Sequence, residues 1–450
     1  MVARIHATAK LILLLGIAMS AVAPARAVAQ TCLAGTAADE FTADSAGLKR
    51  EWILQLPSIA SGYSLDQVVV GDGLVVAQTT DGTVHAVQDA PRNDGLPSPG
   101  TPRPGSLLWS QRSAASGGPI NRAGIGPDLV VVPHGRSLAG LERSTGHARW
   151  HEPLSQSVSG GAAVIGNWVY VPSSAGTINR FAVQPLRTPS DSPTAKTGKK
   201  SVKKAKAKKQ RKESLAPVAI HAGGSENVLF APIALAEGVL WCTSDGLLVC
   251  LQPTELDWRR LEFSLENPPA GPPVVRDRSI FATTTAGDLA RVDLPGSNKE
   301  LQTAWHTVLP GPAVSGPFLS GDTVVVSLGD LGIAAYSAET GSELWHTCLT
   351  GTILAIGGGR VWLIDELGKL SAFDLADGSP RERLCLGPFT LPVVNRHSER
   401  LVLASPSGMV VSLSPRATGT PTPAEAGDAA VTEPAVPVPA TSDPAARPRP

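Results

Sequence analysis

Short apolar runs separated by glycine-containing turns occupy most of the chain. Runs such as VYV (169–171), VVV (324–326) and VWLI (361–364) are rich in β-branched and aromatic residues, which favour strands. The turns between paired runs carry D-G, A-G or S-G, and glycine allows a positive φ there because it has no Cβ. Each pair of runs therefore predicts a β-hairpin.

This hairpin recurs about every 40 residues, a period typical of repeat folds. Several units continue after the second strand into a third run that begins with a T-G-x-x-x-W-like pattern. The eight hairpins span residues 73–87, 128–150, 167–183, 238–251, 279–293, 323–345, 360–378 and 400–413. Hairpins of this kind are marginal alone, and stacking them radially as propeller blades buries their faces.

The two ends of the repeat region predict how the ring closes. KREWILQL (49–56) has the character of a tryptophan-bearing outer strand, yet it precedes the first hairpin. The last unit (391–413) has no such strand after it. We therefore expect an all-β, eight-bladed β-propeller over residues 50–415, closed by the N-terminal strand. The unit at 128–150 is degenerate, and seven blades are the fallback if it is not a blade.

Composition supports this fold and limits the partners. The 45 glycines and 39 prolines suit many short strands and turns. The net charge is zero, but ten basic residues and no acidic one lie between Lys196 and Lys212. Subtracting these ten from the 39 basic residues leaves 29 against 39 acidic ones. The propeller itself is therefore acidic, which argues against a nucleic-acid-binding face on it.

The N-terminus has the features of an export signal. Arg4 and Lys10 precede an apolar run (11–19), and small residues allow cleavage after Ala27 or Ala29. Residues 1–29 are thus interpreted as a signal peptide, and the mature protein as periplasmic or associated with the outer membrane. A retained membrane anchor and lipidation of Cys32 are the alternatives.

Three segments do not fit the hairpin pattern. Residues 187–215 are Lys-rich and low in hydrophobicity, and residues 416–450 are rich in Pro, Ala and Thr; both are expected to be disordered. Residues 89–105 are a smaller loop insertion. The run Lys196–Lys212 is either a solvated loop or a contact with an anionic surface such as a membrane or wall polymer.

Four of the five cysteines form two candidate disulfide pairs. Cys242 and Cys250 flank one hairpin turn, while Cys348 and Cys385 each lie seven residues after a turn glycine in successive units. Either pair could form a disulfide in an oxidising compartment. Buried free thiols are the competing interpretation, and the sequence leaves both open.

Tryptophans mark the outer strands. Six begin or immediately precede such a strand: Trp52, Trp109, Trp150, Trp258, Trp305 and Trp345. Each buries on the order of 150–250 Å² of surface when packed, so a ring of them can join blade to blade. Trp168, Trp241 and Trp362 lie on hairpin strands and are interpreted as sheet-packing residues.

One stretch of the repeat resembles a known family. Ala335, Gly341 and Trp345 are similar to the A-x-x-x-x-x-G-x-x-x-W tryptophan-docking pattern of pyrroloquinoline-quinone (PQQ)-like β-propellers. Gly146 and Trp150 match it in the second unit, where Gly140 replaces the alanine. The seventh unit has Ala372 and Gly378, with Glu382 in place of the tryptophan. In this pattern Gly341 is taken as the turn that aims Trp345.

The resemblance implies two alternative functions. Quinoprotein dehydrogenases of this family bind PQQ and calcium with a Glu/Asn/Asp set, and they often contain a disulfide between adjacent cysteines. This chain has no adjacent cysteine pair. The BamB-like branch binds protein partners in the cell envelope and uses no cofactor. We therefore expect a non-catalytic interaction scaffold without cofactor or metal, with a quinoprotein-type oxidoreductase or other small-ligand-binding protein as the alternative. The nine histidines show no metal-ligand spacing, and no hydrolase or phosphate-loop motif is present.

Overall fold

The computed structural model describes residues 37–416, with gaps at 58, 60–61, 91–101, 114–119, 184–217, 222–226, 237, 254–257 and 296–299. The expected signal peptide (1–29), Cys32, the Lys-rich insertion (187–215) and the tail beyond Arg416 lie outside the described residues. Most of the loop at 89–105 does as well. The interpretations of these segments stay predictions.

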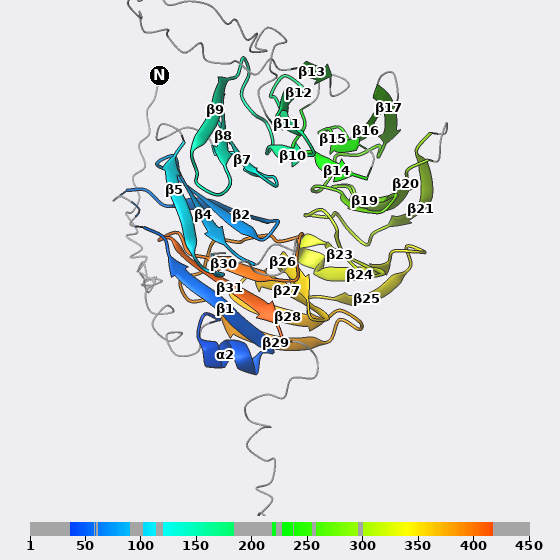
Figure 1. Ribbon diagram of the computed structural model, residues 1–450. Coiled ribbons are helices and arrows are strands. Elements are labelled where there is room, and N and C mark those ends of the chain that lie inside the picture. The colour runs from blue at the N-terminus through cyan, green and yellow to red at the C-terminus, as the bar shows by residue number, and fades with distance from the viewer. Residues whose placement is uncertain are drawn as a thin grey trace, which may run out of the picture.

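The described strands form eight antiparallel sheets arranged in a ring (Figure 1). Blades 1 to 4 consist of β2 (Leu65–Gly71), β3 (Leu74–Thr79), β4 (Thr83–Gln88) and β5 (Leu107–Arg112); β6 (Gly124–Ile125), β7 (Leu129–His134), β8 (Ser137–Glu142) and β9 (Ala148–Pro153); β10 (Ala163–Ile165), β11 (Trp168–Pro172), β12 (Thr177–Ala182) and β13 (Val218–His221); and β14 (Ile233–Leu235), β15 (Gly238–Cys242), β16 (Leu247–Pro253) and β17 (Trp258–Ser264).

The remaining blades follow the same order from the inner to the outer strand. They consist of β18 (Val274–Arg276), β19 (Ser279–Thr283), β20 (Asp288–Asp293) and β21 (Gln302–Val308) in blade 5; β22 (Phe318–Ser320), β23 (Thr323–Ser327), β24 (Ile333–Ser337) and β25 (Glu343–Thr347) in blade 6; β26 (Gly351–Gly357), β27 (Arg360–Asp365), β28 (Lys369–Asp374) and β29 (Pro380–Cys385) in blade 7; and β30 (Leu401–Ala404), β31 (Met409–Pro415) and β1 (Leu48–Gln55) in blade 8. A short helix, α2 (Glu40–Ser45), precedes β1, and a 3₁₀ turn, η2 (Gly329–Leu331), joins β23 to β24.

The N-terminal strand closes the ring, as the sequence predicts. β1 pairs with β31 from Leu48 opposite Pro415 to Gln55 opposite Met409. An isolated bridge between Leu391 and Ala404 supplies the inner edge of this last blade. The degenerate unit at 128–150 forms β7, β8 and β9 of a complete blade. The eight-bladed, all-β prediction is therefore confirmed, and the seven-bladed fallback is wrong.

The core lies between neighbouring blades rather than inside any one of them. A representative cluster combines Val76 and Trp109 of blade 1 with Val130 and Leu141 of blade 2, all of them buried. Both faces of most central strands are consequently apolar, so β3 is buried along its whole length. Each Å² of apolar surface that is buried stabilises the ring by about 25 cal/mol. In the ring both faces of a sheet are buried, whereas an isolated hairpin would leave one face in water.

Strand direction divides the loops between two faces of the ring. Because successive strands run antiparallel, the turns between second and third strands and the connections between blades share one end, called here the upper face. The turns between first and second strands and those between third and fourth strands share the other end, called the lower face. No helix in the described part of the chain is both long and apolar enough to span a bilayer.

Candidate functional site

Five of the six outer-strand tryptophans occupy equivalent positions in the sheet register. Trp52, Trp109, Trp150, Trp305 and Trp345 pair with Ser412, Ala86, Gly140, Arg291 and Ala335, respectively. The indole N–H of each donates to an oxygen of the following blade; the Trp109 Nε1 to Arg143 O distance is 2.7 Å and the Trp345 Nε1 to Leu375 O distance is 2.8 Å. These contacts support the expected role in joining blades, which stays a prediction until it is measured.

The turn glycine of each motif receives the tryptophan of the preceding blade. A Cβ added to Gly341 would lie 2.6 Å from Trp305 Cε3, and one added to Gly378 would lie 2.6 Å from Trp345 Cε3. Both glycines also have a positive φ, 71° and 69°, which a side chain disfavours. Gly341 therefore contacts Trp305 of the preceding blade, while Trp345 rests on Gly378. The expected role of Gly341 in the turn before Trp345 stays a prediction. Sequence spacing alone could not show this pairing between blades.

Trp258 lies outside this register. It pairs with Pro253 at the start of β17, and Leu261, opposite Cys250, holds the position that the other blades give to tryptophan. The Arg180 guanidinium instead lies 4.8 Å from the Trp258 ring and 4.2 Å from the Trp168 ring. Blades 3 and 4 are thus joined by a cation held between two aromatic rings. Trp168 belongs to this contact, while Trp241 on β15 and Trp362 on β27 are buried between their sheets and a neighbouring blade.

The structure contains neither of the two candidate disulfides. Cys242 lies opposite Leu248 and Cys250 opposite Leu240, so the two cysteines are offset along the hairpin. Both are buried free thiols, and burial raises the pKa of each to about 12. Cys348 is exposed on the upper side of blade 6, and no disulfide joins it to Cys385 of blade 7.

This arrangement predicts selective thiol reactivity. At pH 8 a thiol with a pKa of about 12 is thiolate in about one molecule in ten thousand, and thiolate is the reactive form. Maleimide should therefore modify Cys348 in the folded protein long before Cys242 or Cys250, as read from labelled peptides by mass spectrometry. If Cys242 and Cys250 resist maleimide in denaturant until a reductant is added, a disulfide joins them and the structural assignment is wrong.

Exposed large apolar side chains gather on the upper face. Six of the nine in the described ranges lie there: Tyr63, Leu229, Val308, Val314, Leu331 and Leu367. Val308 is 74% exposed and Val314 58% exposed. Val314 and Leu331 belong to adjoining loops, because a Cβ on Gly329 would lie 3.1 Å from Val314 Cγ1 and one on Gly311 would lie 2.4 Å from Leu331 Cδ1. We call Val308, Val314 and Leu331 the upper apolar patch.

The lower face carries ion pairs instead. Arg276 pairs with Asp322 at 3.0 Å and with Glu339 at 2.9 Å, and Arg291 reaches the same Glu339 at 3.1 Å. Arg381 pairs with Asp374 at 2.7 Å in the corresponding turn of blade 7. Two pairs, His306–Asp288 and Arg383–Asp365, lie toward the upper side. The two ends of the ring therefore differ in chemistry.

Metal-binding chemistry finds little support around the ring. Within the described ranges, no group of three His, Cys, Asp or Glu side chains could hold a metal ion. Calcium takes six to eight oxygen ligands, several from carboxylates, so these residues do not fit the metal that a quinoprotein uses. His306 and His346, which follow docking tryptophans, contact Asp288 and the Leu331 carbonyl at the surface.

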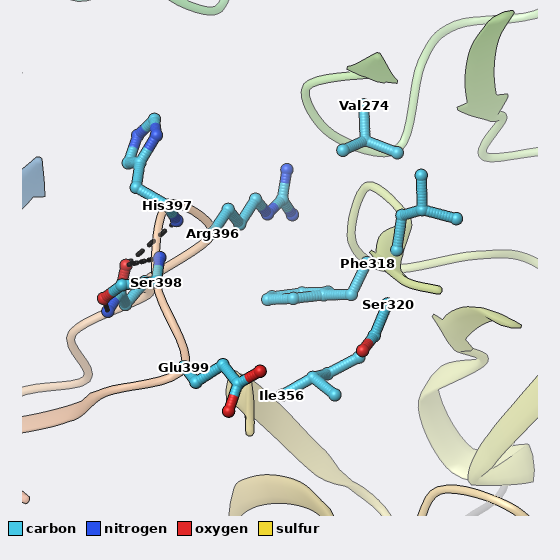
Figure 2. A pocket seen from close by; sticks show the side chains of 10 residues that line it. Val274, Phe318, Ser320, Ile356, Arg396, His397, Ser398 and Glu399 are labelled. Atoms are coloured by element: carbon cyan, nitrogen blue, oxygen red, sulfur yellow. Dashed lines mark hydrogen bonds between the residues drawn. The ribbon is translucent and has the colours of Figure 1, made fainter. Parts of the chain in front are cut away.

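A cavity of about 240 Å³ opens at the inner strands near the lower face (Figure 2). The loop between the Leu391 bridge and β30 forms one wall and carries Arg396, His397 and Glu399, while Phe318 and Ile356 lie on the other side. Pattern reasoning missed this site because a single loop cation carries no periodic signal.

Comparisons with known proteins give a family match over part of the chain and a fold match over most of it. Residues 244–420 match the family model described as outer membrane protein assembly factor BamB. The crystal structure of BamB from Moraxella catarrhalis superimposes with a TM-score of 0.57 at 20% identity, covering 82% of this chain and 99% of that one. A computationally designed protein, Ika8, superimposes at 0.55 and 14% identity, covering 80% and 98%. No curated protein sequence matches significantly.

Proposed function

We propose that this PQQ-like β-propeller, whose fold is that of the assembly factor BamB, is an exported scaffold that binds protein partners in the cell envelope and catalyses no reaction. The mature chain would act in the periplasm or at the outer membrane. Its role there is to present a rigid ring whose upper face docks an apolar surface of a partner.

The observation that carries the proposal is the chemical difference between the two faces. Soluble proteins rarely expose contiguous apolar surface, and patches of this kind mark interaction sites. The upper apolar patch combines a strand end (Val308), a blade connection (Val314) and the η2 turn (Leu331) of two neighbouring blades.

The Lys-rich run adds a second, electrostatic contact to this proposal. Ten like charges between Lys196 and Lys212 would attract an anionic membrane or wall polymer, and that attraction weakens with salt. Deletion of residues 196–212 separates this contact from the apolar one.

The quinoprotein alternative has less support. The described residues provide no cluster of oxygen ligands for calcium, and the inner cavity is lined by one carboxylate, Glu399. Apolar docking explains the exposed upper side chains, whereas quinone chemistry does not.

A triple substitution of the upper apolar patch tests the docking role. Val308→Asp, Val314→Asp and Leu331→Asp together should lower the recovery of any partner cross-linked in the native envelope at least about tenfold, because each buried anchor contributes on the order of 1–2 kcal/mol. Quantitative mass spectrometry of the cross-linked species provides the measurement, and circular dichroism checks that the variant is folded.

Phe41→Asp is the matched control, since Phe41 is 82% exposed but lies on α2 away from the patch. Recovery of the partner should be unchanged with this control. Equal recovery with wild type and the triple variant, or equal loss with both variants, would contradict the proposed docking surface.

A further inference from the structure

The inner cavity holds an arginine whose charge lacks a described counterion. Arg396 extends from its loop over Phe318 toward Val274 (Figure 2). Its Nη1 donates to Pro272 O and its Nη2 to Gly316 O, each at 3.1 Å. These carbonyls belong to the approaches to blades 5 and 6, so the side chain from blade 8 crosses the channel past blade 7.

The position of Arg396 is fixed on several sides, but its bonding is incomplete. Its guanidinium carbon lies 4.4 Å from the centre of the Phe318 ring. The preceding residue, Asn395, accepts from the backbone N–H groups of His397 and Ser398 and donates to Arg400 O, which stiffens the loop. Arg396 Nε is nevertheless buried without a hydrogen-bond partner in the described part of the chain. One donor therefore stays available.

A second arginine lies close to the first. Arg122 immediately precedes the inner strand of blade 2, and in the described ranges its side chain makes no hydrogen bond or ion pair. Burial lowers the pKa of Arg122. Burial and the charge of Arg122 together lower the pKa of Arg396 to about 10. Burial, followed by the charges of Arg122 and Arg396, lowers the pKa of His397.

The nearest cavity carboxylate is engaged elsewhere. Glu399 accepts from the Gly358 N–H at 3.2 Å, and the charge that affects Arg396 is that of Arg122. His397 is neutral at pH 7, because its pKa is lowered from an ordinary value already below 7. The positive charges of Arg122 and Arg396 therefore oppose each other, which costs free energy unless an anion balances them.

We propose that the central channel is a binding site for a small organic carboxylate, which Arg396 holds and Phe318, Ile356 and Val274 contact through its apolar part, while Arg122 adds a second positive charge nearby. The carboxylate balances the positive charge of the Arg396 guanidinium and reduces the repulsion between the two arginines. Charge-assisted hydrogen bonds to a guanidinium are among the stronger ones available to a protein.

The cavity itself selects the class of ligand. At about 240 Å³ it is smaller than the roughly 300–1,000 Å³ typical of drug-sized ligands, so a compact molecule fits. Its apolar wall favours an anion with a hydrocarbon body over inorganic phosphate. This inference is independent of the proposed docking function, because the site lies inside the ring near its lower face and shares no residue with the upper apolar patch.

Titration of the purified mature chain with benzoate, acetate and phosphate tests the proposal. Benzoate should raise the melting temperature saturably and give a heat of binding in calorimetry, with affinity above that of acetate and phosphate. Arg396→Gln should weaken benzoate binding at least about tenfold, the factor that corresponds to about 1.4 kcal/mol. Arg381→Gln, on an exposed lower turn, is the matched control and should bind as wild type does.

Arg122→Gln keeps the proposal testable if Arg396→Gln does not fold. Because Arg122 makes no described side-chain bond and repels Arg396, its removal should maintain or raise the melting temperature without ligand, yet weaken benzoate binding. A merely structural arginine would show the opposite pattern, with lower stability and unchanged affinity. Absence of saturable benzoate binding, phosphate binding as tight as benzoate, or benzoate affinity unaffected by either substitution would overturn the proposal.

Discussion

Replacement of Trp345 by alanine is expected to lower the free energy of unfolding by about 3–5 kcal/mol, the usual cost of truncating a buried large aromatic side chain. Trp345 is 7% exposed and packs with Phe318, Ile353 and Phe373 in one cluster between blades 6 and 7. Its truncation leaves a cavity there and removes the indole donor from Leu375 O. Urea denaturation of the purified variant provides the measurement.

Trp258→Ala is the matched control, because Trp258 is only partly buried and lies outside the docking register. Trp258→Ala should lower the free energy of unfolding by less than half as much as Trp345→Ala does. Gly378→Ala tests the same tryptophan contact from the neighbouring blade. This substitution should also destabilise the protein, because the added methyl group would clash with Trp345 and the positive φ disfavours a side chain. An unchanged urea midpoint for Trp345→Ala would refute the docking role.

Asp89→Ala is expected to lower the free energy of unfolding by a similar amount, about 3–5 kcal/mol, because it breaks a buried charged network. Asp89 is 2% exposed and follows β4 of blade 1. Its Oδ1 accepts from Trp52 Nε1 at 3.0 Å and from Ser412 Oγ at 2.7 Å, and Arg400 Nη1 donates to its carbonyl oxygen at 3.1 Å. The three donors come from β1, from β31 and from the residue just before β30, so Asp89 joins two strands of the closing blade and the approach to a third to blade 1.

Loss of this carboxylate should weaken ring closure specifically. The free energy of unfolding should fall, and limited proteolysis should cut near β1 earlier than in the wild type, because β1 is the only part of the closing blade that comes from the N-terminal side. Asp374→Ala removes a partly exposed pair with Arg381 and should cost at most about 1 kcal/mol. If Asp89→Ala is no less stable than Asp374→Ala, the network does not close the ring.

The fold was accessible from the sequence because its signals are local and repeated. Alternating apolar runs, turn glycines and the displaced strand at 49–56 predict the strand order, the blade number and the closure, and the pairing of β1 with β31 confirms them. The match to a BamB family model and the BamB-like fold confirm the PQQ-like propeller resemblance. Each signal involves residues within one hairpin, where periodicity directly reports burial.

The points that the sequence missed or left open share one cause. Trp258 matched in composition, but strand register places Leu261 at the docking position. Gly341 was expected to direct Trp345 of its own blade, and its contact with Trp305 of the preceding blade was not foreseen. The cysteine pairs had suitable spacing, but a two-residue offset in the hairpin separates Cys242 from Cys250. In each case the deciding contact runs between strands or blades, and spacing along the chain does not encode it.

The sequence by itself determined which segments become strands, where turns fall and that the N-terminal strand completes the last blade, because those outcomes follow from local backbone preference and hydrophobic periodicity. Only the tertiary structure decided that Asp89 meets Trp52, Ser412 and Arg400 of the closing blade. It alone gathered Val308, Val314 and Leu331 on one face and brought Arg122 near Arg396. Ring closure brings together residues far apart in the chain. The role of a charged or exposed side chain depends on these spatial neighbours, which no local sequence pattern specifies.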